Sequence, residues 1–332
     1  MSSSTIIMEP VESQALKGNP LGDPHVRQLP IYLPAGYQEG SQRYPVVYLL
    51  AGFTGSGHSF LNFRAWELNI QQRMDRLIER KRCRPMILVM PDCFTRFGGS
   101  QYLNSSATGS YADYLMELVE HVDKHFRTLS DRHHRAIAGK SSGGYGAMVT
   151  AMRHPEFFAF VADHSGDKYF ELCYKPEFPE LLRAVERLDR PIEEVLADPA
   201  AIRPRGKRSH ALINAVAMSA CYSPNPQSSL GFDFPVDLET GELREDVWER
   251  WLAHDPIELL EGHQEALRSL SLLYFDCGRR DQYNIQYGCR IMHQRLANLG
   301  IDHRYEEFDD DHHTIDYRYD VSLGQISQAM DT

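Results

Sequence analysis

A serine between two glycines, in the run Gly139-Lys140-Ser141-Ser142-Gly143, is the strongest chemical signal in the sequence. An apolar segment precedes this run and a segment rich in small residues follows it, so it joins an expected strand to an expected helix. At such a junction a G-x-S-x-G pattern forms a tight turn that lifts the serine oxygen clear of the sheet. Glycines are needed because neighbouring backbone crowds the serine. We therefore predict that Ser141 is a nucleophile.

A nucleophilic serine needs a base, and a histidine oriented by a carboxylate commonly serves. In one known chain order the serine comes first, then the acid and then the histidine. Two acids follow the apolar segment 270–275. Asp276 ends that segment directly, whereas Asp281 lies in the next loop, from which a side chain can reach over the sheet edge. We favour Asp281 as the acid and expect Asp276 to cap backbone amides around Gly278.

Two adjacent histidines, His312 and His313, follow the last expected strand and the acidic run 309–311. Their adjacency leaves open which of them acts as the base. The same run could suggest a metal site, but no second His/Asp cluster with ligand spacing supports it, except His133-His134, which sits just before an expected strand. The sequence therefore predicts one histidine of this pair as the base, and no metal.

A tetrahedral oxyanion is stabilised by two backbone N–H groups. The residue after the nucleophile supplies one of them, which makes Ser142 the first candidate. The glycine-rich loop 51–57 follows the apolar segment 44–50, and Phe53 in this loop is the expected second donor.

Alternating strands and helices must position these residues. Short apolar runs alternate with amphipathic segments, which is the pattern of an α/β fold with a mainly parallel central sheet flanked by helices. We expect strands at 26–33, 44–50, 85–90, 135–138, 157–162, 270–275 and 303–308, and helices at 70–80, 111–126, 145–153 and 282–299.

The alternation stops in the middle of the chain. Residues 167–266 contain no convincing buried strand, but they hold helical segments and two of the three tryptophans. We predict a core domain made of residues 1–166 and 267–332, interrupted by a largely helical cap at 167–266. Trp248 and Trp251 in the cap are candidates for lining a substrate pocket, although packing within the cap is an alternative.

Composition limits the class of protein. The 332 residues include 42% hydrophobic and 24% charged residues, which is ordinary for a globular protein. A net charge of −11 lacks the footprint of a nucleic-acid binder and should be repelled by anionic lipid. The six cysteines have no C-x-x-C spacing, so we expect small core residues. We find neither a secretory signal nor an apolar run long enough to span a membrane, and expect a cytoplasmic location.

Five segments resemble a known family: 31–37 (IYLPAGY), 44–55 (YPVVYLLAGFTG), 109–115 (GSYADYL), 138–147 (AGKSSGGYGA) and 277–281 (CGRRD). They are similar to the putative-esterase family of α/β-hydrolases, which includes esterase D-type S-formylglutathione hydrolases, feruloyl esterases, enterochelin esterases and mycolyltransferases. The resemblance covers about residues 25–166 and 268–318 and implies an α/β-hydrolase fold. In the family the acid follows a Gly-x-x spacer, which matches Asp281. The histidine is commonly followed by Ser or Thr and then aromatics, which matches His313.

The resulting hypothesis is a serine carboxylesterase that hydrolyses small-molecule esters through Ser141, His313, Asp281 and an acyl-enzyme, without a cofactor. Three alternatives are a thioesterase of the S-formylglutathione hydrolase type, an acyltransferase and a non-catalytic interaction protein on a hydrolase fold. The sequence predicts no nucleic-acid or membrane partner, and it leaves homo-oligomerisation open.

Overall fold

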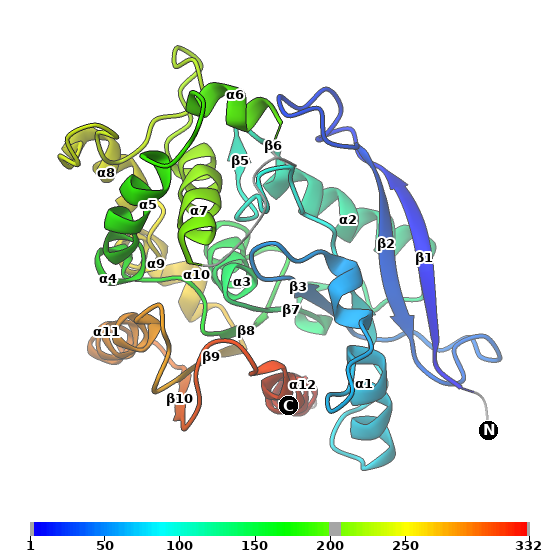
Figure 1. Cartoon of the computed structure of the whole chain (residues 1–332). Helices are drawn as coiled ribbons and strands as arrows, with labels where there is room; N and C mark the ends of the chain where they lie inside the picture. Colours follow the sequence, from blue (N-terminus) through cyan, green and yellow to red (C-terminus); the bar gives the residue numbers. More distant parts are fainter. Residues whose placement is uncertain (1–2, 199–206, 331–332) are drawn as a thin grey trace.

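An eight-stranded sheet crosses the computed structural model, which describes residues 3–198 and 207–330 (Figure 1). The strand order is β1-β2-β4-β3-β7-β8-β9-β10. β1 and β2 are antiparallel, as are β2 and β4, and every other neighbouring pair is parallel. The strands are β1 (Thr5–Glu12), β2 (Val26–Leu33), β3 (Val46–Leu50), β4 (Ile87–Val89), β7 (Arg135–Lys140), β8 (Phe160–His164), β9 (Leu272–Gly278) and β10 (Arg304–Phe308).

Strand β3 shows why this sheet is buried. All five of its residues, VVYLL, are inaccessible, as expected for a parallel strand covered on both faces. Because side chains alternate along a strand, Val46, Tyr48 and Leu50 enter one apolar core, whereas Val47 and Leu49 enter a second one. The sheet therefore separates two layers of helices.

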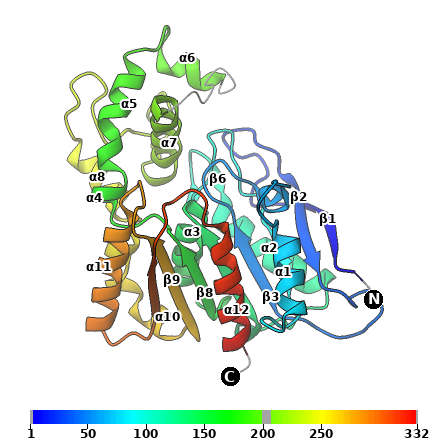
Figure 2. The same ribbon diagram turned by 60° about the horizontal axis from the view of Figure 1, so that its bottom comes forward.

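The two helical layers are built from amphipathic segments. α1 (Ile70–Glu79) and α12 (Tyr319–Ala329) cover the face seen in Figure 2. α2 (Tyr111–His125), α3 (Ser142–Arg153) and α11 (Ile285–Asn298) pack into the core on the other face. In α1 the buried residues Ile70, Met74 and Leu77 recur at helical spacing, which places them on one stripe. The expected strands and helices are confirmed with small shifts of their ends, whereas β1 and α12 were not anticipated.

Between β8 and β9 the described residues are helical apart from turns and two isolated bridges, Pro224 with Phe232 and Val236 with Leu243. In Figure 2, α5, α6 and α7 stand off one end of the sheet. The helices are α4 (Phe170–Cys173), α5 (Phe178–Val185), α6 (Ile192–Ala197), α7 (Lys207–Tyr222), α8 (Glu245–Leu252), α9 (Pro256–Leu259) and α10 (Gln264–Arg268).

Short elements complete the fold. They are a small sheet of β5 (Asn104–Ser105) and β6 (Gly109–Ser110), and the 3-10 turns η1 (Gly57–Leu61), η2 (Arg132–His134), η3 (Lys175–Glu177), η5 (Glu261–His263) and η6 (Asp316–Arg318).

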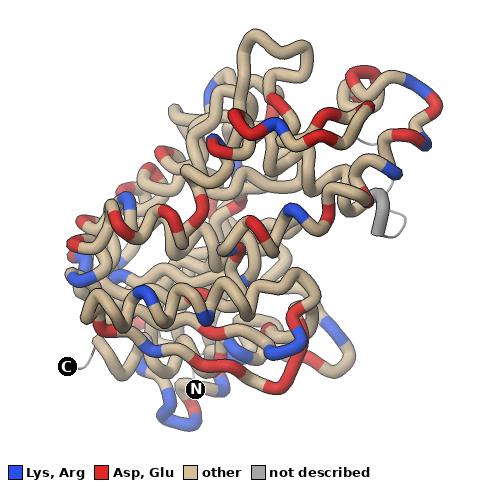
Figure 3. The backbone as a smooth tube through the Cα atoms, turned by 90° about the vertical axis from the view of Figure 1, so that its left-hand side faces the viewer, with Lys and Arg blue, Asp and Glu red and all other residues tan. Residues whose placement is uncertain are grey.

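Surface charge and the cysteines agree with the composition. Figure 3 shows Lys and Arg scattered among Asp and Glu. The whole chain has 35 Lys and Arg residues and 46 Asp and Glu residues. All six cysteines are free and buried, which confirms their expected place in the core. None of the helices in the described ranges is long and apolar enough to cross a bilayer.

Candidate active site

Ser141 lies at the turn between β7 and α3, in a backbone conformation that few side chains adopt. Its φ is 58° and its ψ is −128°, a combination that costs energy unless the surroundings impose it. The flanking glycines allow the neighbouring backbone to pack tightly around this turn, which holds Ser141 in that conformation. A Cβ added to Gly139 would lie 2.3 Å from the Gly143 backbone, and one added to Gly143 would lie 2.0 Å from the Leu50 carbonyl oxygen. The turn thus has the tight form expected from its sequence.

Ser141 is joined to a histidine and an aspartate by consecutive hydrogen bonds. Nε2 of His312 lies 2.9 Å from Ser141 Oγ, and Nδ1 of His312 lies 2.7 Å from Asp281 Oδ2. Because an ionised carboxylate only accepts hydrogen bonds, Nδ1 carries the proton and Nε2 of the neutral ring is left as an acceptor. His312 is 5% exposed and Asp281 is 4% exposed, so bulk water does not separate the three groups.

The histidine in this arrangement is His312, which corrects the expectation of His313. The His313 side chain is exposed. Its main chain is held instead, because its N–H donates to Asp311 Oδ1 over 2.8 Å and its carbonyl accepts from Lys140 Nζ over 2.6 Å. The two rings are nearly perpendicular, at 85°. Adjacent side chains in this loop point in different directions, and only that of His312 turns towards Ser141.

Asp281 occupies the place expected of the acid. It follows β9 in a turn where its Oδ1 accepts the backbone N–H of Tyr283 over 2.9 Å. Its Oδ2 receives His312 and also contacts Cys277 Sγ at 3.6 Å. The carboxylate is therefore oriented by its own loop as well as by the imidazole.

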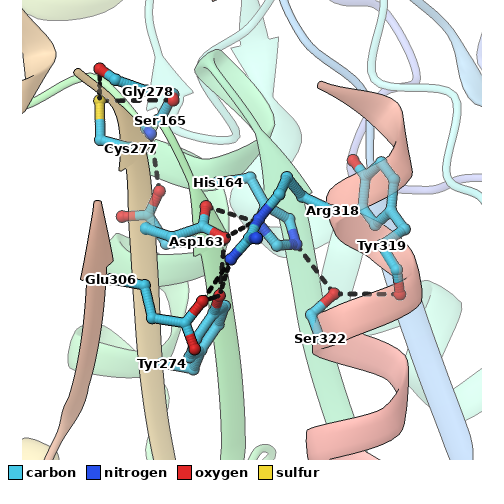
Figure 4. Close-up of polar contacts among 12 residues, drawn as sticks. Asp163, His164, Ser165, Tyr274, Cys277, Gly278, Glu306, Arg318, Tyr319 and Ser322 are labelled. Atoms are coloured by element: carbon cyan, nitrogen blue, oxygen red, sulfur yellow. Dashed lines mark hydrogen bonds and ion pairs between the residues drawn. The ribbon is translucent and has the colours of Figure 1, made fainter. Parts of the chain in front are cut away.

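Asp276 does not cap the amides around Gly278, so that expectation is wrong. Its carboxylate accepts from His164 Nδ1, Arg318 Nε and the Tyr274 hydroxyl, each at 2.7 Å. Figure 4 shows His164, Arg318 and Tyr274 meeting here, with Ser322 Oγ 2.8 Å from His164 Nε2. Burial alone would raise the pKa of Asp276, but attraction and hydrogen bonding from His164 and Arg318 outweigh it, and the pKa is lowered. The partners come from β8 and the C-terminal region, which local sequence does not reveal.

The two residues expected to form an oxyanion hole both lie beside Ser141. Ser142 is the first residue of α3, where a backbone N–H has no partner within the helix. The loop of Phe53 also packs here, because a Cβ added to Gly52 would lie 3.5 Å from Ser141 Cβ. The Tyr102 hydroxyl donates to the Ala51 carbonyl over 2.6 Å and so anchors this loop. The role of Phe53 and Ser142 as donors stays a prediction.

A cavity of about 520 Å³ surrounds Ser141 and His312. One wall comes from the loops before α1 and from the Lys140 and Asp316 region. The other wall comes from the segment between β8 and β9 and from the Asp281 loop. The segment between β8 and β9 contributes Asp167, Cys173, Tyr174, Glu177, His210 and Asn214, and the Asp281 loop contributes Tyr283. Within the described ranges, no group of three or more His, Cys, Asp or Glu side chains is arranged to hold a metal ion.

A family model described as Putative esterase matches residues 24–328. The chain belongs to this esterase family. It is 33% identical over 149 residues to an endo-1,4-beta-xylanase/feruloyl esterase of Xylanibacter ruminicola, a match that covers 42% of this chain and 19% of that protein. It is 30% identical over 144 residues to Esterase Rv1288 of Mycobacterium tuberculosis, which covers 41% and 28%. The chain thus spans less than a third of the length of these relatives.

Solved structures match this chain over nearly its whole length. A ferulic acid esterase superposes with a TM-score of 0.63 at 20% identity, covering 99% of this chain and 100% of that one. The S-formylglutathione hydrolase FrmB of Staphylococcus aureus gives a TM-score of 0.58 at 17% identity, with coverage of 99% and 100%. With its mainly parallel sheet between two helical layers, the chain has the α/β-hydrolase fold.

Trp248 and Trp251 do not line the cavity, so the prediction that they form a substrate pocket is wrong. They are 2% and 1% exposed. Trp248 Nε1 donates to Glu171 over 2.8 Å and Trp251 Nε1 donates to Ser223 over 2.9 Å. Both rings pack on Phe178 in the interior of the helical segment. Burying two large indoles while satisfying their N–H groups stabilises this segment itself.

Several residues of the cavity wall were not among those expected from the sequence. Asp167 lies three residues after the end of β8, and the carboxyl ends of parallel strands are where α/β folds bind ligands, so its position was a usable signal. His210 and Tyr174 carry no such signal, because they reach the cavity only through the packing of α7 and α4. Phe53, His210, Tyr283 and His312 form a row of ring contacts with centroids 4.8–6.1 Å apart.

Proposed function

We propose that this esterase is a serine carboxylesterase that cleaves small-molecule esters through Ser141, His312 and Asp281. The observation that carries the proposal is the hydrogen-bonded chain of these three residues, in which Ser141 lies on a strained turn beside a cavity. A serine, a base and an orienting acid within hydrogen-bond reach are the geometric signature of an activated nucleophile. Membership of the esterase family supports the choice of ester substrates.

The residues fit a two-step acyl transfer. Ser141 Oγ attacks the ester carbonyl carbon while His312 Nε2 takes the hydroxyl proton, and the alcohol then leaves with that proton. Water attacks the resulting acyl-enzyme by the reverse sequence, which releases the acid and restores the serine. Asp281 keeps Nδ1 protonated and stabilises the imidazolium that forms in each step. No cofactor is needed.

The N–H groups of Phe53 and Ser142 are the proposed donors to the oxyanion. Both residues line the cavity beside Ser141, and no acceptor within the described ranges occupies either N–H. Losing one such donor typically raises the barrier by about 2.7–4 kcal/mol. Their contribution would be largest in the tetrahedral intermediate, when the carbonyl oxygen carries negative charge.

We further propose that residues 167–266 act as a cap on the core formed by residues 1–166 and 267–332. Support comes from the helices of this segment, which leave the sheet after β8. Support also comes from its cavity-lining residues, which are Asp167, Cys173, Tyr174, Glu177, His210 and Asn214. Variation in such a segment would change the choice of ester without altering the catalytic groups.

The test is hydrolysis of short p-nitrophenyl esters by the wild type and by Ser141→Ala, combined with mass spectrometry after treatment with a fluorophosphonate. We expect turnover by the wild type, an adduct on the peptide that contains Ser141, and neither for the variant. Turnover by Ser141→Ala above a trace would refute the assignment. Comparing matched oxygen esters and thioesters separates a carboxylesterase from a thioesterase.

A further inference from the structure

Asp167 is a buried carboxylate that faces the catalytic cavity and takes no part in the proposed acyl transfer. It is 6% exposed and lines the cavity next to Ser142. Its hydrogen bonds with the described residues all fall on one oxygen. Oδ2 accepts from the Tyr174 hydroxyl at 2.9 Å, Gln101 Nε2 at 3.2 Å and Ser142 Oγ at 3.3 Å. Oδ1 has no partner within the described ranges.

Oδ1 is open to the cavity, because it is not among the fully enclosed polar atoms that lack a partner. Burial raises the pKa of Asp167, and the bond from Tyr174, the charge of His312 and the bond from Gln101 oppose that shift only in part. Hydrogen bonds to a charged acceptor are stronger than those between neutral groups, so a donor placed at Oδ1 would be bound favourably. A hydrogen-bond donor of the substrate would satisfy Oδ1.

The orientation of Asp167 is fixed by a strained segment. Gln101 and Tyr102 are consecutive non-glycine residues with positive φ, at 48° and 57°. Such conformations are unfavourable and persist only where the surrounding structure imposes them. Gln101 Nε2 also donates to the Tyr222 hydroxyl over 2.8 Å, so this side chain ties Asp167 to α7. The carboxylate is thereby held in place before any ligand arrives.

The cavity has an asymmetry of charge that points to the same ligand chemistry. Its cations are already paired, because Arg64 contacts Glu67 at 2.7 Å, Arg73 contacts Asp320 at 3.1 Å and Lys140 contacts Asp316 at 3.3 Å. Asp167 and Glu177 line the cavity without a salt-bridge partner among the described residues. The charge left for a substrate is therefore negative.

We propose that Asp167 is a specificity-determining residue, whose free carboxylate oxygen accepts a hydrogen bond from a hydroxyl or ammonium group of the ester substrate. The inference rests on the proposed function and names the substrate class of the same site. Esters that carry such a donor close to the scissile carbonyl are preferred over apolar analogues of the same size. Esters that carry a second carboxylate are disfavoured.

The experiment compares isosteric esters on either side of the carbonyl. The acyl series is p-nitrophenyl butanoate, 3-hydroxypropanoate, 3-aminopropanoate and hemisuccinate, and the alcohol series is propyl acetate and 2-hydroxyethyl acetate. In at least one series, the wild type should favour the donor-bearing ester in kcat/KM by about 10-fold or more, as expected for a hydrogen bond to a charged group. The hydroxyl and ammonium arms show which donor is used.

The variant Asp167→Asn keeps the shape but presents an amide, and it should bring the ratio of donor-bearing to apolar ester to within about twofold of one. Asp189→Asn is the matched control, since Asp189 is exposed and does not line the cavity. This control should keep the wild-type ratio and activity. Circular dichroism melts check that each variant is folded.

Two results overturn the inference: wild-type ratios near one in both series, or a folded Asp167→Asn that keeps the wild-type ratio. The wild-type ratios test the inference even if the Asp167→Asn variant does not fold. Failure of the proposed function looks different, because no ester of either series would then be hydrolysed in a manner that depends on Ser141.

Discussion

Two hydrogen-bonded chains of serine, histidine and aspartate occur among the described residues of this protein. In one, His312 lies 2.9 Å from Ser141 and 2.7 Å from Asp281. In the other, His164 lies 2.8 Å from Ser322 and 2.7 Å from Asp276. The first borders a cavity of about 520 Å³, whereas all three residues of the second are at most 1% exposed. Similar bonds between the same residue types therefore occur in two quite different settings.

Access and local backbone distinguish the two serines. Ser141 has a positive φ between glycines, directly before the free N–H groups of a helix start. Ser322 lies within α12, where its backbone is helical and its side chain is packed against β8. An ester cannot reach Ser322, because this residue is fully buried. Its position inside α12 also leaves no helix-start N–H beside it to stabilise an oxyanion. Hydrogen-bonded triad geometry is thus insufficient for catalysis, which also requires space for the carbonyl and donors for its charge.

The buried chain has a structural consequence. Arg318 joins Asp276 and also donates to Glu306 Oε2 over 2.5 Å, so it connects β9, β10 and η6. His164 adds β8 and α12 through Ser322. The loop that carries His312 lies between β10 and η6. The buried chain therefore anchors both ends of the loop that supplies the proposed catalytic base.

Removing one member of each chain should have different effects on activity. His312→Ala should lower kcat/KM for p-nitrophenyl esters by on the order of 10⁵–10⁶, since loss of the base disables the nucleophile. Ser322→Ala should keep activity within about twofold, because its hydroxyl has no route to substrate and contributes about 1 kcal/mol to stability. Steady-state kinetics of folded proteins measure both. A folded Ser322→Ala that is inactive would end the distinction between the two chains.

The acid of the cavity chain should matter for rate. Asp281→Asn should lower kcat by about 10⁴, because the amide favours the wrong imidazole tautomer. The same assay reports this loss, and guanidinium unfolding at pH 7 reports stability. If kcat falls less than tenfold, Asp281 is not the orienting acid.

The acid of the buried chain should matter for stability. Asp276→Asn leaves Arg318 and His164 without their shared anion, and breaking such a buried pair typically costs about 3–5 kcal/mol. Guanidinium unfolding of the variant and the wild type gives the difference. An unchanged free energy of unfolding would show that the network does not hold the sheet to α12.

The lowered pKa of Asp276 predicts a pH dependence. A carboxyl group that is more acidic in the folded protein contributes stability above its unfolded pKa of about 4, and this contribution is lost as the pH falls below that value. The difference in unfolding free energy between the wild type and Asp276→Asn should therefore shrink as the pH drops from 6 towards 3. Urea titrations at several pH values measure it, and a difference that grows on acidification contradicts the assignment.

Only a small effect is expected at the neighbouring histidine. His313→Ala should change kcat/KM by no more than about threefold, because the exposed ring is not hydrogen-bonded to Ser141 and the loop is held by main-chain contacts. Parallel kinetics with His312→Ala provide the comparison. A loss for His313→Ala as large as that for His312→Ala would restore His313 as the base.

Features encoded over a few neighbouring residues could be read from the sequence. The alternation of apolar runs and helical spacings predicted most strands and helices. The glycines around Ser141 predicted a tight turn because only short-range backbone crowding is involved. The position of Asp281 near the histidine could be anticipated because its loop follows a strand directly and because the esterase family has an acid there; its role as the acid stays a prediction.

Features that depend on packing between distant segments were decided only by the tertiary structure. His312 and His313 occupy one loop, and which ring turns inward depends on contacts with Gln282 and Asp281 rather than on local spacing. Asp276 found its partners at positions 164 and 318. The tryptophans went to the interior of the helical segment, while Asp167 reached the cavity. Such choices arise from the competition of many side chains for burial and hydrogen bonds, a competition that chain order alone does not resolve.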